Sequence, residues 1–132
     1  MFKSEDSMQI EHPLYDYLDF TYCSYGTPQI ESSTIRVPIH ELWVLAGFPG
    51  YAEDTYYNEC TIVFEGINSS KRTVSEYADH NRTTIRRTYI VEDGPFLSTT
   101  GESYPCLISG VFPSLNAWIE WEIQASNIII AP

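Results

Sequence analysis

The chain has 132 residues, the length of a single domain, and its hydrophobic fraction of 43% is enough to form a packed core. Asp and Glu number 18 against 7 Lys and Arg, so the formal net charge is -11 at pH 7. This charge argues against nucleic acid and anionic membranes as partners, because both bind cationic surfaces. The chain has no run of about 18 apolar residues, which argues against a membrane-spanning helix.

The composition favours strands over helices. The chain has 14 Ile, 6 Val and 11 Thr but only 6 Ala and 7 Leu, and β-branched residues are enriched in strands. We predict an all-β fold, either an antiparallel β-sandwich or a strongly curved, barrel-like sheet of about six to seven strands with little helix. Residues 1–12 are polar and expected to be frayed, and residues 13–132 are expected to form a single β-rich domain.

Three predicted strands occupy the first half of the chain. Aromatic alternation after Pro13 predicts a strand with a bulge near Leu18. Residues 30–48 hold a second apolar stretch, in which the alternation of residues 35–39 predicts a strand and residues 40–46 either continue it or form one helical turn. Pro38 requires an edge position or a bulge because proline donates no hydrogen bond. Residues 59–66 alternate between two faces and predict a third strand.

The second half of the chain contains the clearer patterns. Residues 71–80 predict a short helix or an irregular strand, and residues 83–91 and 106–112 predict two further strands. Residues 117–125 alternate most regularly, with Ile and Trp on one face opposite a polar face. Residues 128–130 predict a buried strand, and their short connection to the preceding strand predicts a hairpin.

The cysteines indicate a reducing compartment. Cys23, Cys60 and Cys106 are odd in number and widely spaced, which fits neither a disulfide framework nor a zinc site with CxxC pairs. The first residues lack the apolar segment of a secretory signal. We therefore expect three buried thiols in a cytoplasmic protein, with no metal and no cofactor.

The charges are unevenly distributed along the chain. Residues 1–60 carry 10 acidic and 2 basic residues, whereas residues 61–90 carry 3 acidic and 5 basic residues. Within the basic stretch, Arg86 and Arg87 are adjacent on a predicted strand and are expected to point to opposite faces. They are therefore not expected to form one dense cationic patch, and no nucleic-acid site is predicted.

No pattern typical of catalysis is present, and we predict no catalytic residue. Glu120 and Glu122 project from one face of the same predicted strand, about 7 Å apart by strand geometry. Together with Trp118 they suggest an alternative function as a carbohydrate-binding or hydrolytic β-sandwich, because sugar sites combine aromatic platforms with carboxylates. The opposing interpretation is a solvated outer face.

Aromatic and acidic residues coincide in one predicted loop. Tyr and Trp are enriched at interface hot spots, and aromatic faces attract cations. We therefore predict that this loop and the preceding acidic segment bind a basic protein partner, although loop tyrosines can equally pack onto the edge of a core. The predicted partner-binding residues are Asp16, Asp19, Tyr51, Glu53, Asp54, Tyr56 and Tyr57.

The size, acidity, aromatic content and lack of a catalytic motif predict a non-enzymatic, acidic protein-recognition domain. In these properties the chain resembles the small acidic immunity proteins with which bacteria neutralise basic toxins. The resemblance implies occlusion of the toxin, with acidic side chains covering its cationic site, and it assigns no individual residue. A third interpretation is a structural homodimer with residues 128–130 in the seam.

Overall fold

A computed structural model describes residues 7–96 and 102–132 of the chain. The described part contains eleven strands and two short 3-10 helices. The elements are β1 (Met8–Ile10), η1 (His12–Tyr17), β2 (Leu18–Asp19), β3 (Ser24–Tyr25), β4 (Gln29–Glu31), β5 (Thr34–Val44), β6 (Thr55–Glu65), β7 (Ser69–Tyr77), β8 (Ile85–Asp93), β9 (Tyr104–Phe112), η2 (Pro113–Leu115), β10 (Ala117–Ala125) and β11 (Asn127–Ala131).

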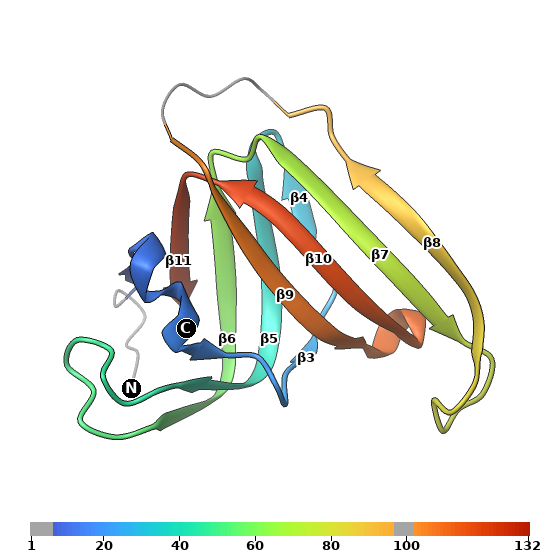
Figure 1. The fold of residues 1–132 in the computed structure, drawn as a ribbon, viewed down its shortest axis with the longest axis horizontal. Coiled ribbons are helices and arrows are strands. Elements are labelled where there is room, and N and C mark those ends of the chain that lie inside the picture. Colours follow the sequence, from blue (N-terminus) through green and yellow to red (C-terminus); the bar gives the residue numbers. More distant parts are fainter. Residues whose placement is uncertain (1–6, 97–101) are drawn as a thin grey trace.

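The strands form one open, strongly curved sheet in the order β1-β11-β6-β5-β3-β9-β10-β7-β8, with β2 and β4 also paired to β5 (Figure 1). The predicted all-β class is confirmed. The predicted number of six to seven strands is wrong, and the sheet does not close into a barrel. The difference in number comes largely from β1 to β4, which have only two or three residues each and are too short to produce a readable alternation.

Two chain segments bend across the same corner of the sheet. β6 continues into β7 and β10 continues into β11, so that the ladder of β6 with β11 is followed by the ladder of β7 with β10. At the corner, the Ser126 N–H donates to the Glu65 carbonyl at 3.0 Å and the Asn68 N–H donates to the Gln124 carbonyl at 2.9 Å. The predicted hairpin of the last two strands is therefore wrong, because β10 and β11 follow each other around the corner and each pairs with other strands.

The short strand β3 joins the two halves of the sheet. It pairs with β5, and Ser24 forms a parallel bridge with Val111 of β9. The Tyr25 hydroxyl then donates to the Ser109 carbonyl at 2.8 Å. The Tyr25 ring lies over Gly110, where a Cβ atom would come within 2.6 Å of the ring and 3.0 Å of the Cys23 carbonyl. The junction therefore requires a residue without a side chain at this position.

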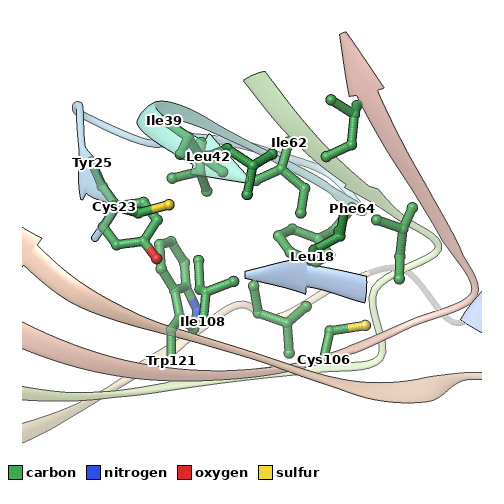
Figure 2. Packing of buried hydrophobic residues seen from close by; sticks show 14 of the residues in the cluster. Leu18, Cys23, Tyr25, Ile39, Leu42, Ile62, Phe64, Cys106, Ile108 and Trp121 are labelled. Atoms are coloured by element: carbon green, nitrogen blue, oxygen red, sulfur yellow. The ribbon is translucent and has the colours of Figure 1, made fainter. Parts of the chain in front are cut away.

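The core lies between the two halves (Figure 2). Leu42, Ile62 and Phe64 face it from β5 and β6, while Ile108 and Trp121 face it from β9 and β10. All five side chains are buried. The predicted alternation of residues 117–125 is confirmed, since every second residue of β10 is buried. Burial of apolar surface stabilises a fold by about 25 cal/mol per Å². We therefore expect this cluster of buried side chains to be the main source of stability.

The N-terminal segment is more ordered than its polarity suggests. Residues 8–10 form β1, in which Met8 pairs with Ile130, so the expected fraying does not extend through residue 12. Residues 1–6 lie outside the described part of the chain. The strand predicted after Pro13 is replaced by η1, because Pro13 occupies the first turn of a helix, where its missing N–H costs nothing.

Pro38 lies within β5, where Thr61 of β6 is its register partner. Its carbonyl accepts from the Gly26 N–H at 2.9 Å, on the side where the chain passes from β3 to β4. On this side of β5, Pro38 lies between the residues that pair with β3 and those that pair with β4, so no strand pairing there requires its N–H. The β5–β6 ladder therefore continues past a residue that cannot donate.

The three cysteines are buried and free, as predicted. Burial raises the pKa of the Cys23 and Cys106 thiols to about 12 and that of the Cys60 thiol to about 11. These thiols stay protonated at neutral pH, and the thiolate is the nucleophilic form. They therefore act as small apolar side chains of the core.

Candidate functional site

Two segments far apart in the sequence meet at one end of the molecule. The long strands β5 and β6 form a hairpin, and β2 pairs with the end of β5 (Figure 1). The Leu45 N–H at the start of the hairpin loop donates to the Tyr17 carbonyl of η1 at 2.8 Å. The predicted partner-binding residues of η1, β2 and the β5–β6 hairpin therefore lie at the same end of the fold.

Three of the predicted residues stabilise the hairpin itself. The Asp54 carboxylate accepts from the Ala46 N–H at 2.8 Å and closes the loop. The Tyr51 ring packs edge-on against Phe48, and its hydroxyl bonds that of Tyr57 at 2.5 Å. Burial and this hydrogen bond raise the pKa of Tyr57. Tyr51, Asp54 and Tyr57 thus have structural roles, and Tyr57 is buried.

A backbone irregularity in β5 exposes a tryptophan that alternation alone would bury. Ile39 faces the core, so strict alternation would also turn Trp43 inward. Glu41 instead adopts a left-handed conformation with φ of 66°. Beyond it Leu42 and Val44 face the core and are fully buried, while Trp43 is only half-buried. An irregularity of this kind shifts every later side chain to the opposite face.

Trp43 lies in the middle of a row that crosses three strands. Its register partners are Asp19 of β2 on one side and Tyr56 of β6 on the other. Opposite residues of antiparallel strands share a face. The rings of Trp43 and Tyr56 lie 5.1 Å apart between centroids, and Tyr56 is 43% exposed. We name Asp19, Trp43, Tyr56 and the neighbouring exposed carboxylates Glu41 and Glu59 the acidic aromatic face.

This face has no Lys or Arg of its own, since none occurs between Arg36 and Lys71. Among the described residues, the one ion pair of this face joins His40 to Glu59, with the His40 Nδ1 atom 3.5 Å from the carboxylate. Asp19 accepts from the Thr21 N–H and hydroxyl, which fixes the orientation of its carboxylate. The face therefore combines a half-exposed aromatic pair with uncompensated negative charge.

The cations of the chain lie mainly on β7, β8 and their connection, where most are neutralised. Arg72 donates to Asp93 at 2.6 Å. Arg86 and Arg87 both bond Glu76 at 2.7 Å. The expectation that these two arginines point to opposite faces is wrong, because the register shifts at Glu76 and Tyr77 and brings both to one carboxylate. The predicted absence of a dense cationic patch remains untested.

The Glu76 cluster has a consequence for stability. Hydrogen bonds from Arg87, Arg86 and Tyr89 lower the pKa of Glu76 from 4.5 to about 2. A lowered folded-state pKa stabilises the fold above the unfolded value, and that contribution is lost as the pH falls through the folded value. We expect Glu76→Gln to be less stable than wild type at pH 7 and to lose less stability between about pH 4.5 and 2.

Chemical denaturation over this pH range measures the effect of Glu76→Gln. Glu92→Gln is the matched control, because Glu92 is exposed on β8 and forms no ion pair among the described residues. Equal pH slopes for Glu76→Gln and wild type would contradict the assigned role. Hydrogen bonds from Thr83 and Thr84 also lower the pKa of Asp79 to about 2, so part of the slope is expected to persist.

The structure separates the predicted residues into groups. Asp19 and Tyr56 belong to the acidic aromatic face, and Tyr51, Asp54 and Tyr57 support the hairpin. The two remaining predicted residues, Asp16 and Glu53, are exposed at the same end of the molecule. Trp43, Glu41 and Glu59 were not predicted from the sequence. The alternation along β5 places Trp43 on the exposed face only when the left-handed conformation of Glu41 is taken into account.

The alternative carbohydrate site lies on the outer face of β10. Trp118 is 36% exposed, and Glu120 and Glu122 are exposed on the same face. A hollow of about 250 Å³ reaches both carboxylates, Lys71 and Leu107, but Trp118 does not line it. The aromatic ring and the hollow are therefore side by side without forming one enclosed site.

The C-terminal strand is not an open edge. β11 pairs with β1 on one side and β6 on the other, and Ile128 and Ile130 face the core. Placing the seam of a homodimer at residues 128–130 is therefore wrong, because the backbone and the side chains there are already used within one molecule.

Comparison with protein-family models, with characterised proteins and with solved structures finds no match. Within residues 7–96 and 102–132, no group of three His, Cys, Asp or Glu side chains is placed to hold a metal ion. No helix in those two ranges has the length and hydrophobicity needed to cross a membrane.

Proposed function

We propose that this chain is a non-enzymatic recognition domain that binds a basic protein through the acidic aromatic face. The observation that carries the proposal is the row of Asp19, Trp43 and Tyr56, in which two aromatic rings 5.1 Å apart adjoin a carboxylate. Arg and Lys side chains of a partner can stack on such rings while pairing with the carboxylates around them.

The surroundings of the row support this class of partner. The hairpin is held by backbone pairing along most of β5 and β6 and by the hydrogen bonds of Asp54 and Tyr51, so the aromatic pair is presented on a rigid support. Binding to a preorganised surface loses less conformational entropy. The net charge of -11 attracts a cationic partner from a distance and accelerates association at low salt.

We expect Trp43→Ala and Tyr56→Ala each to weaken partner binding about tenfold, because aromatic anchors at the centre of an interface contribute most to affinity. The measurement is capture from a lysate of the source cells at low and high salt, followed by mass spectrometry and by titration of the recovered partner. A basic protein is expected with wild-type bait at low salt and should be reduced at high salt.

Trp118→Ala is the control bait, since Trp118 is an exposed tryptophan on the other half of the sheet. It is expected to retain the partner at wild-type affinity. Recovery of the same basic protein by the Trp43→Ala, Tyr56→Ala double variant, at undiminished affinity, would refute the proposed site. Recovery of no basic protein at low salt would refute the proposed class of partner.

An immunity-type role is the specific form of this function that we favour. The domain would cover the cationic substrate site of a toxin and occlude it, without chemistry of its own. The buried reduced thiols support a cytoplasmic location for such a complex. A toxin-like reading frame beside the gene would support this role, and co-expression with the encoded toxin tests it directly.

Carbohydrate binding at Trp118, Glu120 and Glu122 is the second candidate. The exposure of Trp118 favours it, because a sugar ring needs an accessible aromatic face. Binding of glycans to the wild type and its loss in Trp118→Ala would support this function, whereas the Trp43→Ala variant should leave it unchanged.

A further inference from the structure

β8 is an open sheet edge of unusual length. It is the terminal strand of the sheet order, and no strand within the described residues pairs with its outer side. The strand at the opposite end, β1, has three residues, whereas β8 has nine. Natural edge strands are commonly kept short or carry charged residues or Pro. The charged residues of β8 lie near its two ends, and the three residues at its centre, Tyr89 to Val91, carry no charge.

The sequence of β8 is complementary to itself in the antiparallel direction. Arg86 and Arg87 lie near its start, Tyr89, Ile90 and Val91 form its centre, and Glu92 and Asp93 form its end. Ile90 is 58% exposed although it belongs to this apolar centre. Reversing one copy against another sets the apolar centres against each other, while Arg86, Arg87 and Asp93 at the two ends are already paired within each copy.

We propose that β8 pairs antiparallel with β8 of a second copy of this chain, around a two-fold axis at Ile90. In this register Ile90 faces its own counterpart, Tyr89 faces Val91 of the other copy, and the exposed Thr88 faces the exposed Glu92 of the other copy. Residues opposite each other in an antiparallel pair share a face, so each of these contacts is made on one side of the extended sheet. The interface is isologous, as two-fold symmetry requires.

The dimer leaves the acidic aromatic face accessible. β8 and the β5–β6 hairpin lie at opposite sides of the molecule (Figure 1). Two copies joined through β8 would present two such faces and bind a multivalent partner with avidity. The pairing itself depends on β8 alone, so it stands or fails independently of the proposed partner.

Cysteine cross-linking tests the register. The three native thiols are buried, so an introduced cysteine is the reactive one. Ile90→Cys places two thiols opposite each other, whereas Thr88→Cys on the same strand face places them about 13 Å apart, four residues along the paired strands. Ile90→Cys is expected to oxidise to a covalent dimer at least about tenfold faster than Thr88→Cys. Equal rates would overturn the register.

Sedimentation equilibrium across a concentration series tests the dimer. Wild type is expected to associate reversibly, and Ile90→Lys is expected to raise the dissociation constant at least about tenfold, because it places two Lys side chains together at the axis. Leu107→Lys introduces the same charge at a 62% exposed apolar residue of the internal strand β9 and should leave the dimer intact. A wild-type monomer at every concentration, or equal dissociation by both variants, would overturn the proposal.

Discussion

Trp121→Ala is expected to lower the free energy of unfolding by about 3–5 kcal/mol, the range for removing a large buried aromatic side chain. Trp121 is 1% exposed in the centre of β10 and lies 6.1 Å from the Phe112 ring. Its Nε1–H donates to the Ser70 hydroxyl at 2.7 Å, and the Arg72 guanidinium lies over its ring at 4.9 Å. The substitution removes both a core side chain and the support of a polar cluster.

Trp121→Phe and Trp118→Ala separate these contributions. Trp121→Phe keeps most of the ring but removes the donor to Ser70, and it should cost about 1–3 kcal/mol. Trp118→Ala removes an exposed tryptophan three register rows from Arg72 and should change stability by about 0.5 kcal/mol or less. Urea denaturation of the three variants provides the measurement. A loss of less than about 1 kcal/mol in Trp121→Ala would contradict the placement of Trp121 in the core.

Gly110→Ala is expected to destabilise the fold by about 2–3 kcal/mol, because overpacking at a tight contact forces neighbouring groups to move. The added Cβ would lie 2.6 Å from the Tyr25 ring and 3.0 Å from the Cys23 carbonyl. The glycine also has a φ of +153°, which disfavours a side chain. Both crowded groups belong to the segment that contains β3, so the substitution acts where the two halves of the sheet are joined.

Gly50→Ala is the control for Gly110→Ala. Gly50 has a φ of +89°, but a Cβ there would meet nothing within 4 Å. It therefore reports the conformational cost alone, about 1 kcal/mol. If thermal denaturation gives both variants the same loss of stability, the close approach of Tyr25 to Gly110 is not what holds β3 against β9.

Where apolar and polar residues alternate regularly, the sequence correctly predicts which residues share a face of a strand. Residues 117–125 alternate without interruption, and β10 follows this pattern because it is central and paired on both sides. The same pattern in residues 59–66 puts Cys60, Ile62 and Phe64 on one face, and all three are buried in the core. These faces are readable because a two-residue period leaves only one way to bury them.

Backbone irregularities account for most of what the sequence did not reveal. The left-handed residue Glu41 turns Trp43 outward, and the register shift at Glu76 and Tyr77 brings Arg86 and Arg87 to one carboxylate. Neither position has a neighbouring residue such as Gly that would indicate a backbone irregularity in the sequence. Both features therefore depend on tertiary pairing, and the candidate site was predicted only in part for this reason.

The loop tyrosines illustrate a second limit. Tyr51 and Tyr57 were predicted to bind a partner because Tyr is frequent at interfaces. In the structure their hydroxyls bond each other and Tyr57 is buried. Composition identifies a residue type that suits binding, whereas only the fold distinguishes a tyrosine on the surface, such as Tyr56, from one that supports the hairpin.

The location of cation binding on the protein surface tests the central claim most directly. Titration of an isotope-labelled sample with an arginine-rich peptide, followed by NMR, reports the residues whose signals shift. The account predicts the largest shifts at Asp19, at the Trp43 indole and at Tyr56, with loss of these shifts at high salt. Shifts centred on Glu120 and Glu122, or spread evenly over the acidic surface, would contradict the acidic aromatic face as the binding site.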